Sequence, residues 1–345
     1  MKNAQRPIIA LGIQLVRHSL LDKVVSFAEK NNIPLVTTLL SKSAIDETHP
    51  QFMGVFAGKM SRAEISDYVE NSDCLLVLGA YISDMDTGVY SAQVDPTKVV
   101  HATDDRLRVS RHIYEKVGFT DFVNAVTSLS FDKAFAATYP RVADLPAPGM
   151  GDDSAALTVS ALFARLAPMI TAKTVVIADP GDALFGAIDL PTKDGKDFIA
   201  CGYYASLGFA VPAAIGVAAA DSSLRPIVLV GDGAFQMTGM ELSVAARYGY
   251  EPIVIVLNND GYLTERLILE GEFNDITPWH YANLPAVIGC GHGQVVQTNG
   301  EFSEALTDAI ARRGQFTLIE AKLARMDSSD ALRRLGEAMH QLVSK

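Results

Sequence analysis

Short runs of apolar residues, each ended by a turn, recur along the chain and determine its predicted architecture. Their length fits strands that are buried in a parallel sheet. Four such runs lie in the first half, at residues 7–11, 34–40, 74–78 and 98–101, and four in the second, at residues 174–178, 226–230, 252–257 and 316–320. Segments with a helical pattern separate them. This alternation predicts an α/β fold, with two Rossmann-like parallel-sheet domains that carry helices on both faces.

A stretch rich in proline, glycine and acid divides the two sets of strands. Residues 146–153 are the best candidate for a linker. We therefore expect one domain over residues 1–145 and a second over residues 154–345. The second domain is predicted to end in an amphipathic helix over residues 329–343, whose apolar stripe consists of Leu332, Leu335, Met339 and Leu342.

Residues 226–265 form the stretch around which we interpret the rest of the chain. Two predicted strands end at Asp232 and at Asn259, and a helix is expected between them. The pair Thr238 and Glu241 has the spacing of a capping box, so this helix is predicted to start there, with Met240, Val244 and Tyr248 on one face. A right-handed crossover between parallel strands would bring Asp232 and Asn259 to the same sheet edge.

The residue types at this edge suit a metal ion and a phosphate. The Asp232 carboxylate, the Asn259 amide and the backbone carbonyl of Gly261 form an oxygen set of the kind that Mg²⁺ or Ca²⁺ prefers. Gly231 and Gly233 allow backbone N–H groups to approach an anion at a helix N-terminus. An ordinary βαβ unit could also contain a glycine turn and an asparagine turn, but both turns at this spacing favour the binding site.

The stretch Gly231-Asp232-Gly233, followed by Asn258-Asn259, resembles the diphosphate motif of thiamine diphosphate (ThDP)-dependent enzymes. The sequence NNDGYLTE at residues 258–265 is similar to the version found in 2-oxo acid decarboxylases of the pyruvate and indolepyruvate type. The segments RPIIALG and DCLLVLGAYISDMDTG resemble the middle domain of the same family. The resemblance implies ThDP and Mg²⁺ as cofactors and a small 2-oxo acid as substrate.

The resemblance also implies roles for individual residues. Glu265 corresponds to a proton donor or relay, Leu207 to the side chain that bends the cofactor, and Ala205 to a backbone acceptor for its aminopyrimidine. Mg²⁺ would be held by Asp232, Asn259 and Gly261. The remaining cofactor contacts would come from Gly181, Asp182, Ser206, Gly231, Gly233, Ala234 and Tyr262. For Glu265 an exposed helix-start position, and for Asp182 an acidic cap after a glycine turn, are the structural alternatives.

Composition limits the other function classes. The chain of 345 residues has a net charge of −11, with 29 Lys and Arg against 40 Asp and Glu, and contains no basic run. This charge balance argues against nucleic acid and anionic membranes as partners. Three scattered cysteines fit a reducing cytoplasm, and we expect neither a signal peptide nor a membrane span.

The resemblance covers two of the family's three domains, because the sequence begins at the middle domain. The pyrimidine-binding domain carries the glutamate that activates ThDP, so we expect a separate pyrimidine-domain subunit and a dimer or higher oligomer. Three alternatives remain open. They are a carboligase subunit of the acetolactate-synthase type, a truncated module that binds ThDP weakly, and a non-catalytic scaffold subunit.

Overall fold

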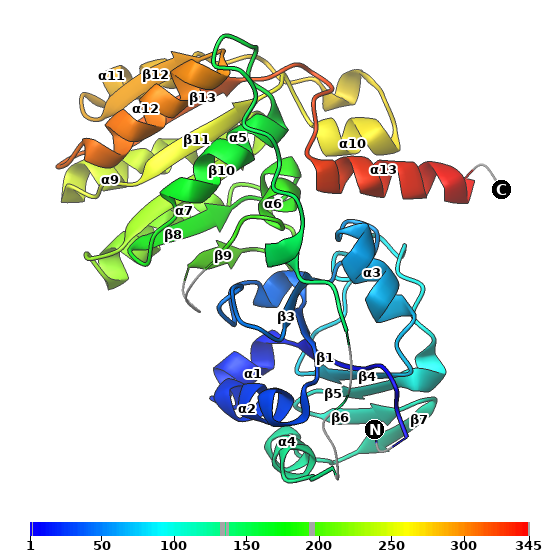
Figure 1. Cartoon of the computed structure of the whole chain (residues 1–345). Helices are drawn as coiled ribbons and strands as arrows, with labels where there is room; N and C mark the ends of the chain where they lie inside the picture. Colours follow the sequence, from blue (N-terminus) through cyan, green and yellow to red (C-terminus); the bar gives the residue numbers. More distant parts are fainter. Residues whose placement is uncertain (2, 132–134, 136–137, 193–196, 344–345) are drawn as a thin grey trace. The chain divides into compact units, whose positions relative to one another are not determined.

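The computed structural model describes residues 1, 3–131, 135, 138–192 and 197–343, with side chains to residue 338 in the last helix. The chain divides into two compact units. The first consists chiefly of Met1–Leu145, and the second of Pro146–Thr192 together with a later segment that ends at Gly336. Each unit contains one sheet with its own helices (Figure 1). The predicted α/β class is confirmed.

The sheet of the first unit has seven strands in the order β3-β2-β1-β4-β5-β6-β7. Strands β1 to β5 pair in parallel, whereas β6 and β7 form an antiparallel hairpin at one edge that the sequence patterns did not predict. The strand bounds are β1 (Pro7–Leu11), β2 (Leu35–Thr37), β3 (Phe52–Val55), β4 (Cys74–Leu78), β5 (Val99–Ala102), β6 (Arg106–Val109) and β7 (His112–Glu115).

Helices cover both faces of this sheet because successive side chains of a strand point to opposite faces. Ile9 and Leu11 of β1 pack in the cluster with helices α1, α2 and α4, and Ile8 and Ala10 pack in the cluster with α3. These helices are α1 (Ile13–Arg17), α2 (Leu21–Asn31), α3 (Ala63–Glu70) and α4 (Phe119–Thr127). The unit also has the short 3₁₀ helices η1 (Leu39–Ser41), η2 (Pro96–Lys98) and η3 (Val142–Asp144).

The sheet of the second unit has six strands, all parallel, in the order β12-β13-β11-β10-β8-β9. Its central strands β8, β10 and β11 are almost entirely buried, which explains their continuous apolar sequences. The strand bounds are β8 (Thr174–Ala178), β9 (Phe198–Ala200), β10 (Arg225–Gly231), β11 (Ile253–Asn258), β12 (His292–Val296) and β13 (Thr317–Lys322).

One face of this second sheet packs against α7, α8 and α9, and α5, α6 and α12 lie over the other face (Figure 1). The helices are α5 (Val159–Leu166), α6 (Asp182–Ala187), α7 (Ala210–Ala220), α8 (Asp232–Thr238), α9 (Leu242–Tyr248), α10 (Leu263–Ile268), α11 (Leu284–Ile288), α12 (Asn299–Ala311) and α13 (Asp330–Val343). Short 3₁₀ helices are η4 (Ala167–Met169), η5 (Gly239–Glu241), η6 (Glu272–Asn274) and η7 (Tyr281–Asn283).

The helix predicted between β10 and β11 differs from the observed one. It begins at Asp232, not near Thr238, and is followed by η5 and α9. The Thr238 hydroxyl donates to the Gly208 carbonyl over 2.7 Å and caps no helix, so the predicted capping box is wrong. The predicted face is exposed at Met240 and Tyr248, whereas Leu242 and Ala245 enter the core.

The C-terminal end of the predicted linker (residues 146–153) is bonded to Arg165 of helix α5 in the second unit. The Arg165 guanidinium donates to the carbonyls of Met150 and Gly151 over 2.8 Å each and pairs with Asp153. In the C-terminal helix, Leu332 and Leu335 of the predicted apolar stripe are buried, while the side chains of Met339 and Leu342 lie outside the described residues.

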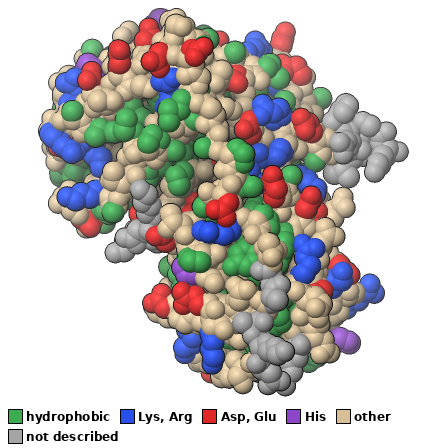
Figure 2. Space-filling view, in the orientation of Figure 1, with side chains coloured by type: hydrophobic (Ala, Val, Ile, Leu, Met, Phe, Trp, Pro, Cys, Tyr) green, Lys and Arg blue, Asp and Glu red, His purple; other side chains and the backbone are tan. Residues whose placement is uncertain are grey.

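Side chains of both charges are interspersed on the face of the molecule that Figure 2 shows. Within the described residues, no helix is long and apolar enough to cross a membrane. Cys74, Cys201 and Cys290 are all free thiols, and Cys74 is buried in β4.

Candidate functional site

Asp232 and the 259–261 turn meet at the carboxyl edge of the second sheet. Strands β10 and β11 pair in parallel, with Gly231 opposite Leu257, so the residues after both strands emerge side by side. The Asp232 carboxylate accepts the Gly261 N–H over 3.1 Å and the Gly233 N–H over 2.7 Å. The crossover between the strands therefore brings together residues that are 29 positions apart.

The Asp232 carboxyl group is buried, with 1% of the residue exposed. Burial raises the pKa of this carboxyl to about 6, although backbone N–H groups of Gly261, Gly233 and Asp260 act in the opposite direction. Desolvation disfavours the charged form. A cation bound beside Asp232 would favour the ionised carboxylate and so offset the cost of burying its charge. The buried Asp232 carboxylate is therefore suited to ligate a metal ion.

Asn259 supplies a second oxygen at this edge. It is buried, and its side chain makes no hydrogen bond to the other described residues. A buried amide without a protein partner is a group that a ligand or water would satisfy. No group of three or more His, Cys, Asp or Glu side chains suited to a metal lies in the described part of the chain. One carboxylate with amide and carbonyl oxygens fits a hard cation that keeps positions open for phosphate oxygens.

At Gly233 the Tyr262 ring lies directly against the backbone, so any side chain there would force the ring to shift. A Cβ at Gly233 would lie 2.5 Å from the Cε1 atom of Tyr262. Gly231, the residue before α8, has extended backbone and open space around it. The side chain of Ala234 packs into the core with Phe235, so only the backbone of Ala234 is available to a ligand.

The loop after β8 arrives next to α10. Gly181 has a φ of +99°, and a Cβ there would lie 3.7 Å from the Thr264 hydroxyl oxygen. Asp182 is buried, and both of its oxygens are bonded to Ser329: one accepts the Ser329 N–H over 2.8 Å and the other the Ser329 hydroxyl. Ser329 in turn accepts the Leu332 N–H over 3.1 Å at the start of α13. The side chain of Asp182 thus serves an internal contact in this chain.

The turn at residues 205–208 presents apolar surface. Ala205 has a φ of +51°, Ser206 is exposed, and Leu207 is 37% exposed. Gly208 has a φ of +81°. These four residues precede α7, whose small side chains pack against β8 and β10. An exposed leucine on a fixed turn is suited to contact a ligand or another polypeptide.

Asp179, which the sequence analysis did not select, holds that turn. It is fully buried, and its two oxygens accept the Gly208 N–H over 2.9 Å and the Ala210 N–H over 2.8 Å. Burial raises the pKa of Asp179 to about 6. Its position directly after β8 is the same signal that identified Asp232 after β10, so the sheet-edge rule could have found it.

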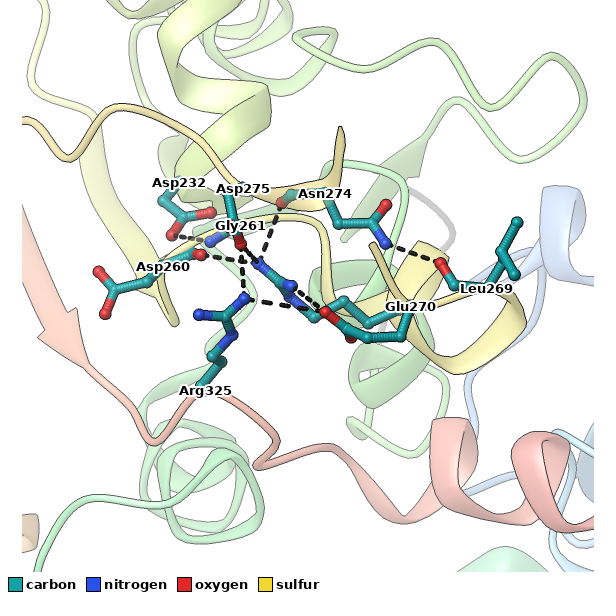
Figure 3. Close-up of polar contacts among 9 residues, drawn as sticks. Asp232, Asp260, Gly261, Leu269, Glu270, Asn274, Asp275 and Arg325 are labelled. Carbon is teal, nitrogen blue, oxygen red and sulfur yellow. Dashed lines mark hydrogen bonds and ion pairs between the residues drawn. The ribbon is translucent and has the colours of Figure 1, made fainter. Parts of the chain in front are cut away.

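Glu265 lies in the first turn of α10 and is exposed. The partial burial that the proton-transfer role favours is absent within this chain. Its neighbour Arg266 is the other residue that the sequence analysis missed. The Arg266 guanidinium is buried and donates to the carbonyl of Asp260 in the 259–261 turn; Figure 3 labels Asp260 and Gly261 of this turn. Nothing local in the sequence distinguishes it from an exposed helical arginine, because its partners come from the following loop.

Two family models match most of the chain. The model "Thiamine pyrophosphate enzyme, central domain" matches residues 1–128, and "Thiamine pyrophosphate enzyme, C-terminal TPP binding domain" matches residues 181–321. The second match contains every candidate site residue from Gly181 to Glu265.

Among curated proteins, the indole-3-pyruvate decarboxylase of Azospirillum brasilense is 33% identical over an alignment of 345 positions that covers 99% of this chain and 63% of that protein. The alpha-keto-acid decarboxylase of Mycolicibacterium paratuberculosis is 32% identical over 86% of this chain and 53% of its own length. The alpha-keto-acid decarboxylase of Mycobacterium bovis is 31% identical, with corresponding shares of 89% and 56%. This chain therefore spans between about half and two thirds of these relatives.

Proposed function

Because this chain belongs to the thiamine pyrophosphate enzymes, of which it carries the central and the C-terminal TPP-binding domains, we propose that it is the ThDP- and Mg²⁺-binding part of a 2-oxo acid decarboxylase. Its substrate would be a small 2-oxo acid. The printed names of its relatives, an indole-3-pyruvate decarboxylase and alpha-keto-acid decarboxylases, support this reaction class.

The observation that carries the proposal is the contact between Asp232 and Gly261. It joins the two turns of the predicted diphosphate motif at one sheet edge, with Asn259 beside them and its amide unbonded by any other described residue. Asp232, Asn259 and the Gly261 carbonyl would hold Mg²⁺. The N–H groups at the start of α8, around Gly233, would face the phosphate oxygens.

The chemistry that bound ThDP would supply is that of an electron sink for the loss of CO₂ from the 2-oxo acid. This chain's own residues would bind and orient the cofactor. Leu207 would support its bend from the turn that Asp179 fixes. Glu265 is exposed at the start of α10, where it would donate or relay a proton to the reacting carbon.

A second polypeptide is part of the proposal. Leu207 and Glu265 are exposed around the candidate site. We infer that a subunit with a pyrimidine-binding domain covers this edge in a dimer or higher oligomer. The free thiols fit a reducing cytoplasm, which the proposal includes.

Calorimetric titration of the full chain with ThDP, with and without Mg²⁺, tests the binding site. We expect Mg²⁺-dependent binding that Asp232→Ala abolishes. Asp308→Ala is the matched control, because Asp308 is an exposed aspartate on α12 of the same unit and its side chain is unbonded by the other described residues. Unchanged binding in Asp232→Ala, or equal loss in both variants, would contradict the assignment.

Decarboxylation assays on pyruvate and indolepyruvate test the need for a second subunit. The purified chain alone is expected to be nearly inactive even when saturated with ThDP. Activity should appear on addition of a co-purifying polypeptide that contains a pyrimidine-binding domain. Full activity of the chain alone, in a sample that mass spectrometry shows to hold no other polypeptide, would refute the partner.

A further inference from the structure

Arg266 is a buried cation, and its partners Asp260, Glu270, Asn274 and Asp275 are labelled in Figure 3. Its side chain is 0% exposed and forms ion pairs with Asp275 over 2.6 Å and with Glu270 over 2.8 Å. A buried guanidinium needs carboxylates and carbonyls as partners for its N–H groups. Nη1 and Nη2 of Arg266 have such partners, whereas Nε has none among the described residues. Arg325 lies on the outer side of the same carboxylates, 2.5 Å from Asp275 and 3.8 Å from Glu270.

The inner side of the Arg266 guanidinium contacts backbone. Its Nη2 atom donates to the Asp260 carbonyl over 3.1 Å and to the Asn274 carbonyl over 3.1 Å. Asn274 also receives the Tyr262 N–H over 3.0 Å at its carbonyl. One nitrogen of Arg266 thus joins the 259–261 turn to the loop that runs past it.

The Asp260 carbonyl and the Gly261 N–H belong to the same peptide group, which is planar. Arg266 holds this group at its oxygen, and Asp232 holds it at its nitrogen over 3.1 Å. Because the group is rigid, the direction of the carbonyl fixes the direction of the N–H. Arg266 therefore determines where the N–H that binds Asp232 points, although Arg266 and Asp232 make no direct contact.

The packing around Gly261 leaves this arrangement little freedom. Gly261 has a φ of +134°, and a Cβ there would lie 2.3 Å from the Asn274 oxygen and 2.6 Å from the Arg266 Nη2 atom. The backbone of Asn274 and the Arg266 guanidinium therefore lie close against Gly261 and leave no room for a side chain there. The 259–261 turn and the Arg266 guanidinium that contacts it therefore form one closely packed group.

We propose that Arg266 is the positioning residue of the candidate metal site. It holds the Asp260–Gly261 peptide directly and the Gly261–Tyr262 peptide through the Asn274 carbonyl, and so sets the Asp232 carboxylate and the Gly261 carbonyl to face one cation. This inference rests on the proposed function, since it concerns the Mg²⁺ and diphosphate that the site would bind. Arg266 acts through the peptide group and touches neither ligand.

In the first experiment the full chain is titrated with Mg²⁺ at saturating ThDP, and binding is measured by calorimetry. Arg266→Lys keeps the positive charge but replaces the planar guanidinium, whose Nη1 binds Glu270 while Nη2 binds both carbonyls and Asp275, with a single ammonium nitrogen on a shorter side chain. We expect its apparent Mg²⁺ affinity to fall by roughly 10- to 100-fold, as for other residues that orient metal ligands. Arg325→Lys, in the same charged cluster but without contact to the turn, should change the affinity less than about threefold.

The second experiment uses the chain without ThDP or Mg²⁺ and follows hydrogen exchange of the backbone over residues 259–262. Exchange at Gly261 should accelerate roughly tenfold or more in Arg266→Lys and stay unchanged in Arg325→Lys, because only Arg266 holds that peptide. This readout separates the two hypotheses. If the unmodified chain binds no ThDP but the exchange result holds, the proposed function fails and the positioning of the turn stands.

Unchanged exchange and unchanged Mg²⁺ affinity in Arg266→Lys would overturn the inference. So would an equal loss in Arg325→Lys, which would assign the effect to the geometry of the whole ion-pair cluster and not to the contact of Arg266 with the turn. Should Arg266→Lys fail to fold, Asp275→Asn offers a milder change. This substitution removes one ionised partner of Arg266 at 2.6 Å and leaves both carbonyl contacts of Arg266 in place. An intermediate acceleration of exchange at Gly261 is therefore expected. No acceleration would count against the positioning role of Arg266.

Discussion

The bond between Asp182 and Ser329 gives a prediction that can be worked through in energy terms. Both oxygens of a buried carboxylate accept hydrogen bonds from one serine, which also caps α13 through the Leu332 N–H. A hydrogen bond to a charged group contributes about 1.5–3 kcal/mol, and an N-cap serine about 1 kcal/mol. We expect Ser329→Ala and Asp182→Asn each to destabilise the second unit by roughly 2–3 kcal/mol.

A double-mutant cycle isolates the pair. The double variant should be less destabilised than the sum of the single variants, with a coupling energy of about 1–3 kcal/mol. Urea unfolding at pH 7.5 keeps Asp182 ionised, since burial raises its pKa to about 6. The chain has one tryptophan, Trp279, which lies in the second unit, so its fluorescence follows the unit that contains the pair.

A coupling energy below about 0.5 kcal/mol would refute this reasoning. It would mean that Asp182 is not committed to Ser329 in solution, and that its carboxylate is free for the diphosphate role that the sequence resemblance implies. The matched control is Ser160→Ala, because the Ser160 hydroxyl lies 3.4 Å from Asp330 in the same region but does not contact Asp182.

Three further predictions concern single residues. Burial raises the pKa of Asp179 from 3.8 to about 6, so the folded state binds this proton more tightly than the unfolded chain does. The protonated Asp179 therefore adds stability that is fully present below pH 4. This stability, up to about 3 kcal/mol, is lost as the pH rises through 6. Urea titrations between pH 4 and 7.5 should show a weaker decline in Asp179→Asn, and parallel pH curves would contradict the assignment. Gly233→Ala places a methyl group 2.5 Å from the Tyr262 ring and should cost about 1–3 kcal/mol, measured by Trp279 fluorescence; no loss would show that the ring is free to move. Gly261→Ala should destabilise more than Gly249→Ala, because both have positive φ but only Gly261 has backbone within 3 Å of the added carbon; equal midpoints of thermal unfolding would contradict this.

The strands, and the polar turns that follow them, could be predicted from the sequence because a strand that is buried on both faces has an uninterrupted run of apolar residues. Residues 7–11, 74–78 and 174–178 were predicted with the observed bounds. Short strands with mixed sequences, such as β9 and β12, have no such signal. The capping pattern at Thr238 misled because a threonine hydroxyl can equally bond a distant carbonyl, here that of Gly208.

The candidate site was readable to the extent that it follows from topology. The βαβ rule brings Asp232 beside the 259–261 turn, and the structure has that contact. Asp182 and Arg266 required tertiary information. The partner of Asp182 is 147 positions away, and Arg266 is buried only because the 270–275 loop returns over it.

The separation between Asp182 and Ser329 also bears on the order in which the chain folds. In a flexible chain, closing a loop of 147 residues costs about 1.4 kcal/mol more than closing the 29-residue loop between Asp232 and Gly261. During synthesis, Asp182 leaves the ribosome long before its partner has been made, and domains fold as their residues emerge. The sheet edge with Asp232 can therefore assemble first, while the loop after β8 keeps a carboxylate exposed to water until residue 329 arrives and α13 can start.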